Sequence, residues 1–316
     1  MRDNRTGLPA GGSGSELEIL ESIRRRARLP GQRGLALGIG DDCAIYRPPG
    51  AREDLLFTTD LLLEDVHFRH ATHPPEALGH KALARGLSDI AAMGGVPRFC
   101  LLSLAAGPRA DRRWIDRFYT GLLRLARICG APLAGGDLAH SAKTGCDIVV
   151  CGAVPRGAAL RRDGARAGDS IYVSGRLGGS ALGLGSGTGK AWLRHLRPQP
   201  RLALGVFLRE RIGASAAIDL SDGISLDLRR MALASGLEAA IDPPPRFPGA
   251  NPEQALHGGE DYELLFTVGS RVKVPPRLGS IPLTRIGVMR RGQAGAVYLL
   301  GKPLPALGYD HFRGSP

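Results

Sequence analysis

The chain has 316 residues, which is enough for one large domain or for two domains of ordinary size. Its 43% apolar and 23% charged residues are typical of a globular protein, and no apolar run approaches the roughly 18 residues that a membrane span needs. The net charge of +12 raises nucleic acid and anionic small molecules as partners. Because the basic residues are spread along the chain instead of forming one tract, we expect no nucleic-acid partner and no membrane partner.

Residues 1–14 are rich in Gly and lack the apolar stretch of a signal peptide. We therefore expect a flexible tail and a cytoplasmic location. The cysteines are an odd number without any C-x-x-C pair, and they are Cys43, Cys100, Cys129, Cys146 and Cys151. This pattern argues against a disulfide framework and against a structural zinc site.

Apolar periodicity and capping residues predict a mixture of helices and strands along the whole chain. In the first half we expect helices from residue 15 and at 76–93 and 111–129, and strands at 36–39, 54–59, 99–105 and 147–154. In the second half we expect strands at 170–174, 264–268, 285–288 and 296–299, and helices at 202–212 and 226–235. The Arg- and Gly-rich segment 155–168 separates the halves, so we predict an α/β (α+β) fold with domains at 15–154 and 155–316.

Six short acidic clusters stand beside Gly, Ser or Thr, in a chain that holds only 30 acidic against 42 basic residues. They contain Asp41 with Asp42, Asp60, Asp89, Asp137, Asp219 with Asp222, and Glu260 with Asp261. Carboxylates in turns bring oxygen ligands together, and Mg²⁺ is usually held by a few carboxylates together with substrate phosphates. The alternative for any single cluster is a turn or a helix cap. Asp89 falls in the last turn of a predicted helix, where a cation or a hydrogen-bond donor should compensate its charge.

Two further patterns are weaker evidence for a functional site. The segment 185–191 resembles a phosphate-binding loop, but Leu184 and Ala191 replace the glycine and the hydroxyl residue that this motif requires, so we expect a flexible connection. His67, His70 and His73 do not have the spacing of a convergent zinc site, and we expect His70 and His73 to be exposed. No G-x-S-x-G segment or similar nucleophile motif indicates covalent catalysis.

Nine segments resemble the thiamine-monophosphate kinase family in order and in register, from about residue 15 to residue 312. They are GIGDDCA, TTDLLLEDVHF, KALARGLSDIAAMGG, LAGGDLA, RRDGARAGDSIYVSG, RHLRPQPR, AIDLSDGISLDL, HGGEDYELLFT and GYDHF. This family belongs to the superfamily of aminoimidazole ribonucleotide synthetase and selenophosphate synthetase. The alternatives are another ATP-dependent enzyme of that superfamily, of either of these two types, and a basic nucleic-acid-binding protein without ATP turnover.

The resemblance implies a two-domain aminoimidazole ribonucleotide synthetase-like fold, a homodimer whose N-terminal sheets pair, and an active site in the interdomain cleft. It also implies transfer of phosphate from ATP to thiamine monophosphate with several Mg²⁺ ions. The implied metal ligands are Asp42, Thr58, Thr59, Asp60, Asp89, Asp137, Asp219 and Asp222. The implied ATP contacts are Tyr119, Gly136, Arg162 and Ser221, and the implied thiamine-phosphate contacts are His67, Glu260 and Tyr309. We expect Glu260 to favour the cationic thiazolium and Tyr309 to stack on the rings.

Overall fold

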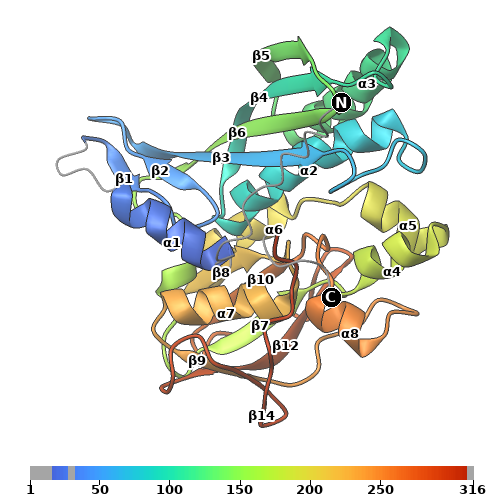
Figure 1. Cartoon of the computed structure of the whole chain (residues 1–316). Coiled ribbons are helices and arrows are strands. Elements are labelled where there is room, and N and C mark those ends of the chain that lie inside the picture. Colours follow the sequence, from blue (N-terminus) through green and yellow to red (C-terminus); the bar gives the residue numbers. More distant parts are fainter. Residues whose placement is uncertain (1–15, 28–32, 312–316) are drawn as a thin grey trace, which may run out of the picture.

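A computed structural model describes residues 16–27 and 33–311, so the predicted tail 1–14 lies outside the described residues. The described chain forms two β-sheets with helices packed against them (Figure 1). Between residues 16 and 27 and from 33 to 311, no helix is long and apolar enough to cross a membrane.

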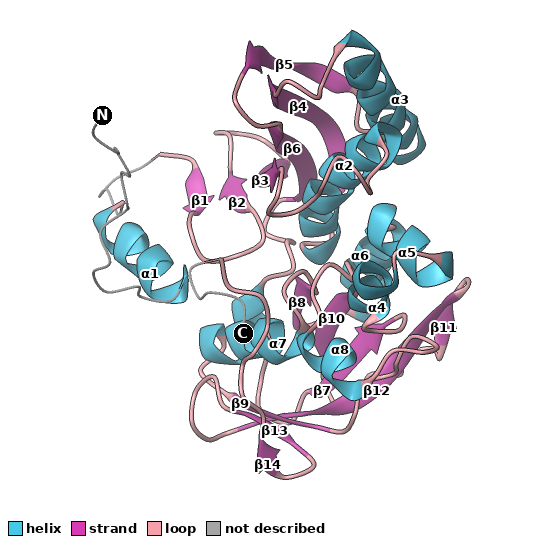
Figure 2. Ribbon diagram, turned by 45° about the vertical axis from the view of Figure 1, so that its right-hand side comes forward, coloured by secondary structure: helices cyan, strands magenta, loops and turns pink. Residues whose placement is uncertain are grey.

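The N-terminal sheet has six strands in the order β1-β2-β3-β6-β4-β5. Their bounds are β1 (Leu35–Leu37), β2 (Ala44–Tyr46), β3 (Glu53–Leu63), β4 (Val96–Ala106), β5 (Leu133–His140) and β6 (Gly145–Pro155). The helices of this half are α1 (Glu16–Arg26), α2 (Pro75–Ala92) and α3 (Arg112–Cys129). The strands β4 and β5 pair in parallel, because α3 carries the chain back across the sheet between them. Figure 2 shows α2 and α3 together on one face of this sheet.

The C-terminal sheet follows the order β14-β13-β9-β12-β7-β10-β8, with β11 paired to β12. Its strands are β7 (Ser170–Ser174), β8 (Ala216–Asp219), β9 (Glu238–Ile241), β10 (Leu264–Val268), β11 (Arg277–Leu278), β12 (Ile281–Arg290), β13 (Val297–Leu299) and β14 (Lys302–Pro303). Its helices are α4 (Gly179–Ser186), α5 (Gly189–Leu196), α6 (Leu202–Phe207), α7 (Ile224–Ala234) and α8 (Pro252–His257).

The mixed α/β class and the main helices and strands are confirmed. The expectation of a flexible connection at 185–191 is wrong, because this segment contains the end of α4 and the start of α5. The hairpin of these helices forms despite its glycines, since a side chain at Gly183 would overlap the backbone of Ala191. The strand β6 ends at Pro155 and β7 begins at Ser170, and the predicted domain boundary between them stays a prediction.

The helix α2 joins the two halves of the protein. Fourteen of its 18 residues are buried. Its apolar side chains belong to the core that α3 and the N-terminal sheet share, whereas Ala91 and Ala92 pack with Leu204 and Phe266 of the C-terminal half. The contacts of one helix with both sheets therefore fix how the two halves face each other.

Glycines on the neighbouring helices let α2 approach them closely. A Cβ atom at Gly121 of α3 would lie 1.9 Å from the carbonyl oxygen of Glu76, and one at Gly205 of α6 would lie 2.0 Å from that of Ala91. Neither distance leaves room for an atom, so these helix pairs depend on the missing side chains.

Gly121→Ala should lower the free energy of unfolding by about 1–3 kcal/mol, because the new methyl group overlaps a backbone oxygen that cannot move alone. Gly185→Ala in α4 is the matched control, since nothing lies within 4 Å of its Cβ position. The control should be neutral or stabilising by up to about 1 kcal/mol, because alanine favours the helix. Urea denaturation checks both; equal stability changes would contradict the close-packing argument.

Candidate active site

The two halves of the chain enclose a cavity of about 1580 Å³. Its lining comes from the loop that follows β1, from β3 and α2, and from two turns of the C-terminal half that contain Asp219 to Asp222 and Gly259 to Tyr262. The lining therefore comes from both halves of the chain, and the active-site cleft that the resemblance implies stays a prediction.

Three carboxylates from distant parts of the chain meet at one end of the cavity. Oxygen atoms of Asp42, Asp89 and Asp219 all lie within 4.8 Å of one another. Each carboxylate also has a partner: Thr58 Oγ1 donates to Asp89, Ser88 Oγ donates to Asp219 at 2.7 Å, and Arg162 contacts Asp42. The donor that we expected at the end of the predicted helix is therefore Thr58.

Burial and mutual repulsion shape the titration of this triad. Asp219 is only 2% exposed. Burial raises the pKa of Asp89 and of Asp219 well above the ordinary value, and repulsion between the triad carboxylates adds to this effect. A bound divalent cation would relieve both causes. Three close oxygen ligands without nitrogen or sulfur suit a hard cation, so the donor set fits Mg²⁺.

Two more of the predicted metal ligands are paired with arginines. Arg85 of α2 holds both oxygens of Asp60, through Nε at 2.9 Å and Nη2 at 2.5 Å. Arg230 of α7 contacts Asp222 and also the buried Asp227. These arginines offset carboxylate charge around the triad.

A buried lysine pairs with Glu260, which lines the cavity. Lys81 of α2 is 0% exposed, and its Nζ lies 2.8 Å from both oxygens of Glu260, with hydrogen-bond geometry only toward Oε2. Burial alone would raise the pKa of Glu260, but attraction from Lys81, and next from His195, outweighs it and lowers the pKa to about 2. Glu260 is therefore ionised, and its charge is already compensated inside the protein.

His67 presents a neutral imidazole in the lining of the cavity. Burial, together with repulsion from Arg85, lowers its pKa to about 3. Its Nδ1 accepts a hydrogen bond from the backbone N–H of Leu63 at 3.0 Å, so the ring proton is on Nε2, which has no partner. The ring of His311 lies 5.1 Å from that of His67 and 4.7 Å from that of Tyr309. The rings of His67, Tyr309 and His311 thus form an aromatic wall of the cavity.

The loop that carries Glu260 is held rigidly. The backbone φ of Glu260 is 63°, in the left-handed region that side-chain-bearing residues rarely adopt. Nearby, Arg194 and Arg201 both contact the buried carboxylate of Glu263, and Asp261 accepts from the N–H groups of Gly178 and Ser180 at the start of α4. The RHLRPQPR segment thus serves to anchor this loop.

Most of the metal-binding and substrate-binding residues that the resemblance implies line the cavity. Every one of them lines it except Tyr119, Gly136 and Asp137. Tyr119 lies on α3, where its ring packs edge to face on Phe118. Gly136 and Asp137 lie on the edge strand β5, away from the cleft.

Two expectations about side chains are wrong. His73 is buried and shares a hydrogen bond with His195 at 3.2 Å, and the side chain of His70 is mostly covered beside Thr144. The loop that holds these histidines folds back onto α5 and α3, which local sequence does not reveal. Glu260 was expected to favour the cationic thiazolium; its carboxylate is paired with Lys81, and the predicted contact stays a prediction.

Lys81 and Arg85 contact predicted site residues but were not themselves predicted from the sequence. Together with Ser88 and Asp89, they recur at spacings of four, three and one along α2, which places all four on one face of the helix. We define these four residues as the polar stripe of α2. Four polar residues at this spacing on a helix otherwise rich in Ala and Leu are a signal that the sequence contains.

Comparisons with known proteins agree with this geometry. Residues 40–155 match the family model described as AIR synthase related protein, N-terminal domain. Thiamine-monophosphate kinase of Escherichia coli strain K12 is 39% identical, with 87% of this chain and 92% of that protein covered. The enzyme of the same name from Bacillus subtilis strain 168 is 33% identical, with 94% and 99% covered.

Among solved structures, AaThiL complexed with AMPPCP and TMP superimposes with a TM-score of 0.83 at 33% identity, and the match covers 94% of this chain and 97% of that one. Identity at this level over nearly whole chains confirms the resemblance found in the sequence segments. The chain belongs to the thiamine-monophosphate kinase family.

Proposed function

We propose that this protein transfers the γ-phosphoryl group of ATP to thiamine monophosphate and releases thiamine diphosphate. The observation that carries the proposal is the triad of Asp42, Asp89 and Asp219 in the cavity between the two halves of the chain. The related structure named for AMPPCP, an ATP analogue, and for TMP supports the choice of both substrates.

The chemistry of the acceptor explains why the cavity needs no strong base. A phosphate monoester has a second pKa of about 6, so its oxygen is already nucleophilic at neutral pH. The main obstacle is repulsion between donor and acceptor phosphates, about 4 kcal/mol for each pair of unit charges 4 Å apart at an effective dielectric constant of 20. Positioning and charge neutralisation therefore do most of the catalytic work, and we propose direct in-line transfer without a phosphoenzyme.

Several Mg²⁺ ions are part of this proposal. Asp42, Asp89 and Asp219 would hold them, and the neighbouring oxygen donors would be Thr58, Thr59, Asp60 and Asp222. Bound Mg²⁺ supplies positive charge between the phosphate groups.

The residues implied for both substrates line the same cavity. Arg162 and Ser221 would contact ATP, whereas His67, Glu260 and Tyr309 would contact thiamine monophosphate. Because Lys81 neutralises Glu260, its Oε1 would act there mainly as a hydrogen-bond acceptor, and the aromatic rings would supply attraction for the cationic thiazolium.

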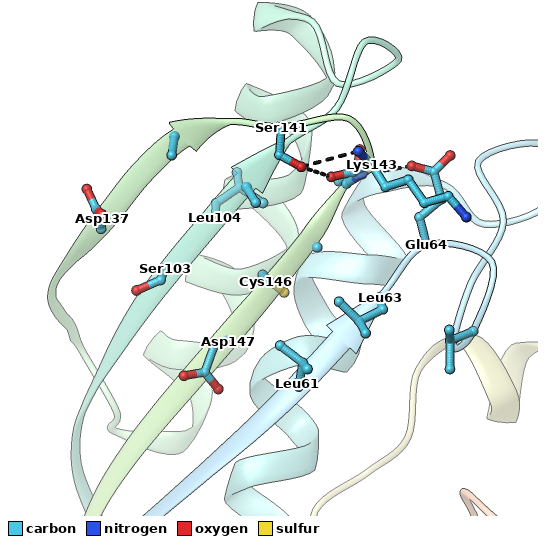
Figure 3. A pocket seen from close by; sticks show the side chains of 15 residues that line it. Leu61, Leu63, Glu64, Ser103, Leu104, Asp137, Ser141, Lys143, Cys146 and Asp147 are labelled. Carbon is cyan, nitrogen blue, oxygen red and sulfur yellow. Dashed lines mark hydrogen bonds between the residues drawn. The ribbon is translucent and has the colours of Figure 1, made fainter. Parts of the chain in front are cut away.

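We also propose a homodimer through the open face of the N-terminal sheet. Asp137, Ser103, Asp147 and Leu61 lie side by side on β5, β4, β6 and β3 across this face (Figure 3). They line a hollow of about 500 Å³, and Leu61 is 49% exposed. A sheet face with apolar side chains needs a cover, and a second copy would supply one.

The dimer would connect this face to the catalytic cavity. Thr59 lines the cavity, and its hydroxyl donates to Asp147 of the open face at 2.6 Å. Since Gly136 and Asp137 are remote from the cleft of their own chain, their predicted contacts with ATP and metal would need the second copy.

We place the reaction in the cytoplasm, because it consumes ATP.

The first prediction concerns the metals. Asp89→Asn keeps the shape of the side chain but removes its charge, so turnover at limiting Mg²⁺ should fall by about 100-fold or more. Calorimetric titration should show weakened Mg²⁺ binding, and circular dichroism should show an unchanged fold. Near-normal turnover and Mg²⁺ affinity would remove Asp89 from the proposed metal site.

The second prediction concerns the acceptor. Thiamine brings no phosphate oxygen to attack ATP, so its turnover should be lower than that of thiamine monophosphate by at least about 100-fold. Direct chromatographic measurement of thiamine diphosphate from ATP, Mg²⁺ and thiamine monophosphate tests the activity itself. Comparable phosphorylation of the two acceptors would overturn the assignment.

The third prediction concerns assembly. Light scattering at micromolar concentration should give twice the 33.4 kDa mass of one chain. Leu61→Asp places a charge on the open face, so it should dissociate the dimer and reduce turnover. Leu193→Asp, on the exposed side of α5, is the matched control and should leave a dimer. A monomeric wild-type protein with full activity would refute the proposal.

A further inference from the structure

Some polar atoms of residues that line the cavity are buried without a hydrogen bond. In the part of the chain that the structure describes, five buried side-chain polar atoms lack a hydrogen bond, and three belong to residues that line the cavity. These three are His67 Nε2, Arg85 Nη1 and Glu260 Oε1. Buried polar groups normally have partners, so an unsatisfied group beside a cavity indicates where a ligand completes the structure.

The geometry of Arg85 makes it the most informative of the three. Its side chain is 12% exposed, and its Nε and Nη2 atoms both bind Asp60. These two atoms lie along one edge of the planar guanidinium, so Nη1 lies at the opposite edge and keeps its own two protons. Asp60 thus fixes the orientation of the group without using all its donors.

The ligand group that suits Nη1 is an anion. A guanidinium has only donors and matches the oxygen geometry of phosphate. A second donor belongs to the same cavity, since His67 also lines it and carries its proton on the unpartnered Nε2. A phosphate monoester offers several acceptor oxygens and can satisfy both donors.

The position of Arg85 favours the acceptor substrate over ATP. Arg85 interacts electrostatically with His67 and Glu260, which are both implied thiamine-phosphate contacts. Arg162, an implied ATP contact, is instead paired with Asp42 of the triad. We infer that Arg85, oriented by Asp60 and assisted by His67, binds the phosphate of the acceptor. This inference rests on the proposed function and deepens it, because it names the residue that distinguishes thiamine monophosphate from thiamine.

The test measures what the phosphate contributes to binding. Isothermal titration of the full-length protein in Mg²⁺, without ATP, gives the Kd of thiamine monophosphate and the Kd of thiamine, and their ratio is the selectivity. Arg85→Gln should reduce this selectivity by about tenfold or more, by weakening thiamine monophosphate alone. Arg85→Lys should lose part of it, because one ammonium group cannot bind Asp60 and also reach a phosphate at the opposite edge.

Arg117→Gln is the matched control. Arg117 binds both oxygens of Glu76 through its Nε and Nη2 atoms, as Arg85 does with Asp60, but it is 48% exposed and lies outside the cavity. Its substitution should leave the selectivity unchanged. Since Arg85→Lys keeps the charge beside Asp60, it serves as the informative variant should Arg85→Gln fail to fold.

The outcomes separate the inference from the proposed function. Equal weakening of both ligands by the Arg85 substitutions would make the Arg85–Asp60 pair structural, and unchanged selectivity would exclude a phosphate contact; either result overturns the inference. If the wild-type protein converts thiamine monophosphate but the Arg85 variants give one of these results, only the inference is overturned. If the wild-type protein neither prefers nor phosphorylates thiamine monophosphate, the proposed function is overturned.

Discussion

The polar stripe of α2 is the constraint around which the rest of the structure is arranged. Lys81, Arg85 and Asp89 are charged residues on a helix that is buried between two sheets. A buried charge without a partner is strongly destabilising, by about 3–5 kcal/mol when one member of a buried pair is removed. Each charge therefore requires a partner at a defined place, and the fold provides one.

These partners come from both halves of the chain. On β3, Asp60 pairs with Arg85 and Thr58 donates a hydrogen bond to Asp89. In the C-terminal half, Glu260 pairs with Lys81. Ser88 reaches Asp219 at the end of β8. The same interactions that satisfy the helix thus align the two sheets and assemble the cavity, so that stability and the site have a common origin.

The balance of charge in the cavity also follows from these pairs. Arginines accompany three of the predicted metal ligands: Arg162 with Asp42, Arg85 with Asp60, and Arg230 with Asp222. They reduce the repulsion that a set of buried carboxylates would otherwise impose on the folded state. Within the triad, Asp89 and Asp219 accept from neutral hydroxyl groups, and the pKa of each is raised well above its ordinary value. A cation bound at the triad would therefore interact most strongly with this pair.

The sequence by itself determined the features that depend on short-range patterns. Periodicity predicts the helices now seen as α2 and α3, and the acidic turns around Asp42, Asp60 and Asp219 identify residues that the structure brings into one cavity. These features are readable because turn residues and helix spacing act within a few positions of the chain. The segments shared with the family add the order of the motifs and the class of reaction.

Only the tertiary structure decided which long-range partners these residues have. The polar residues of α2 resemble a solvated helix face in the sequence, and only the packing of a second sheet against α2 shows that they are buried or half-buried. The glycines of α4 disfavour a helix locally, but they permit the close contact with α5 that stabilises it. In the sequence, Asp137 resembles the other predicted metal ligands, but its place on β5 puts it on the open face of the N-terminal sheet. In each case the deciding interaction joins residues far apart in the chain, which local pattern cannot specify.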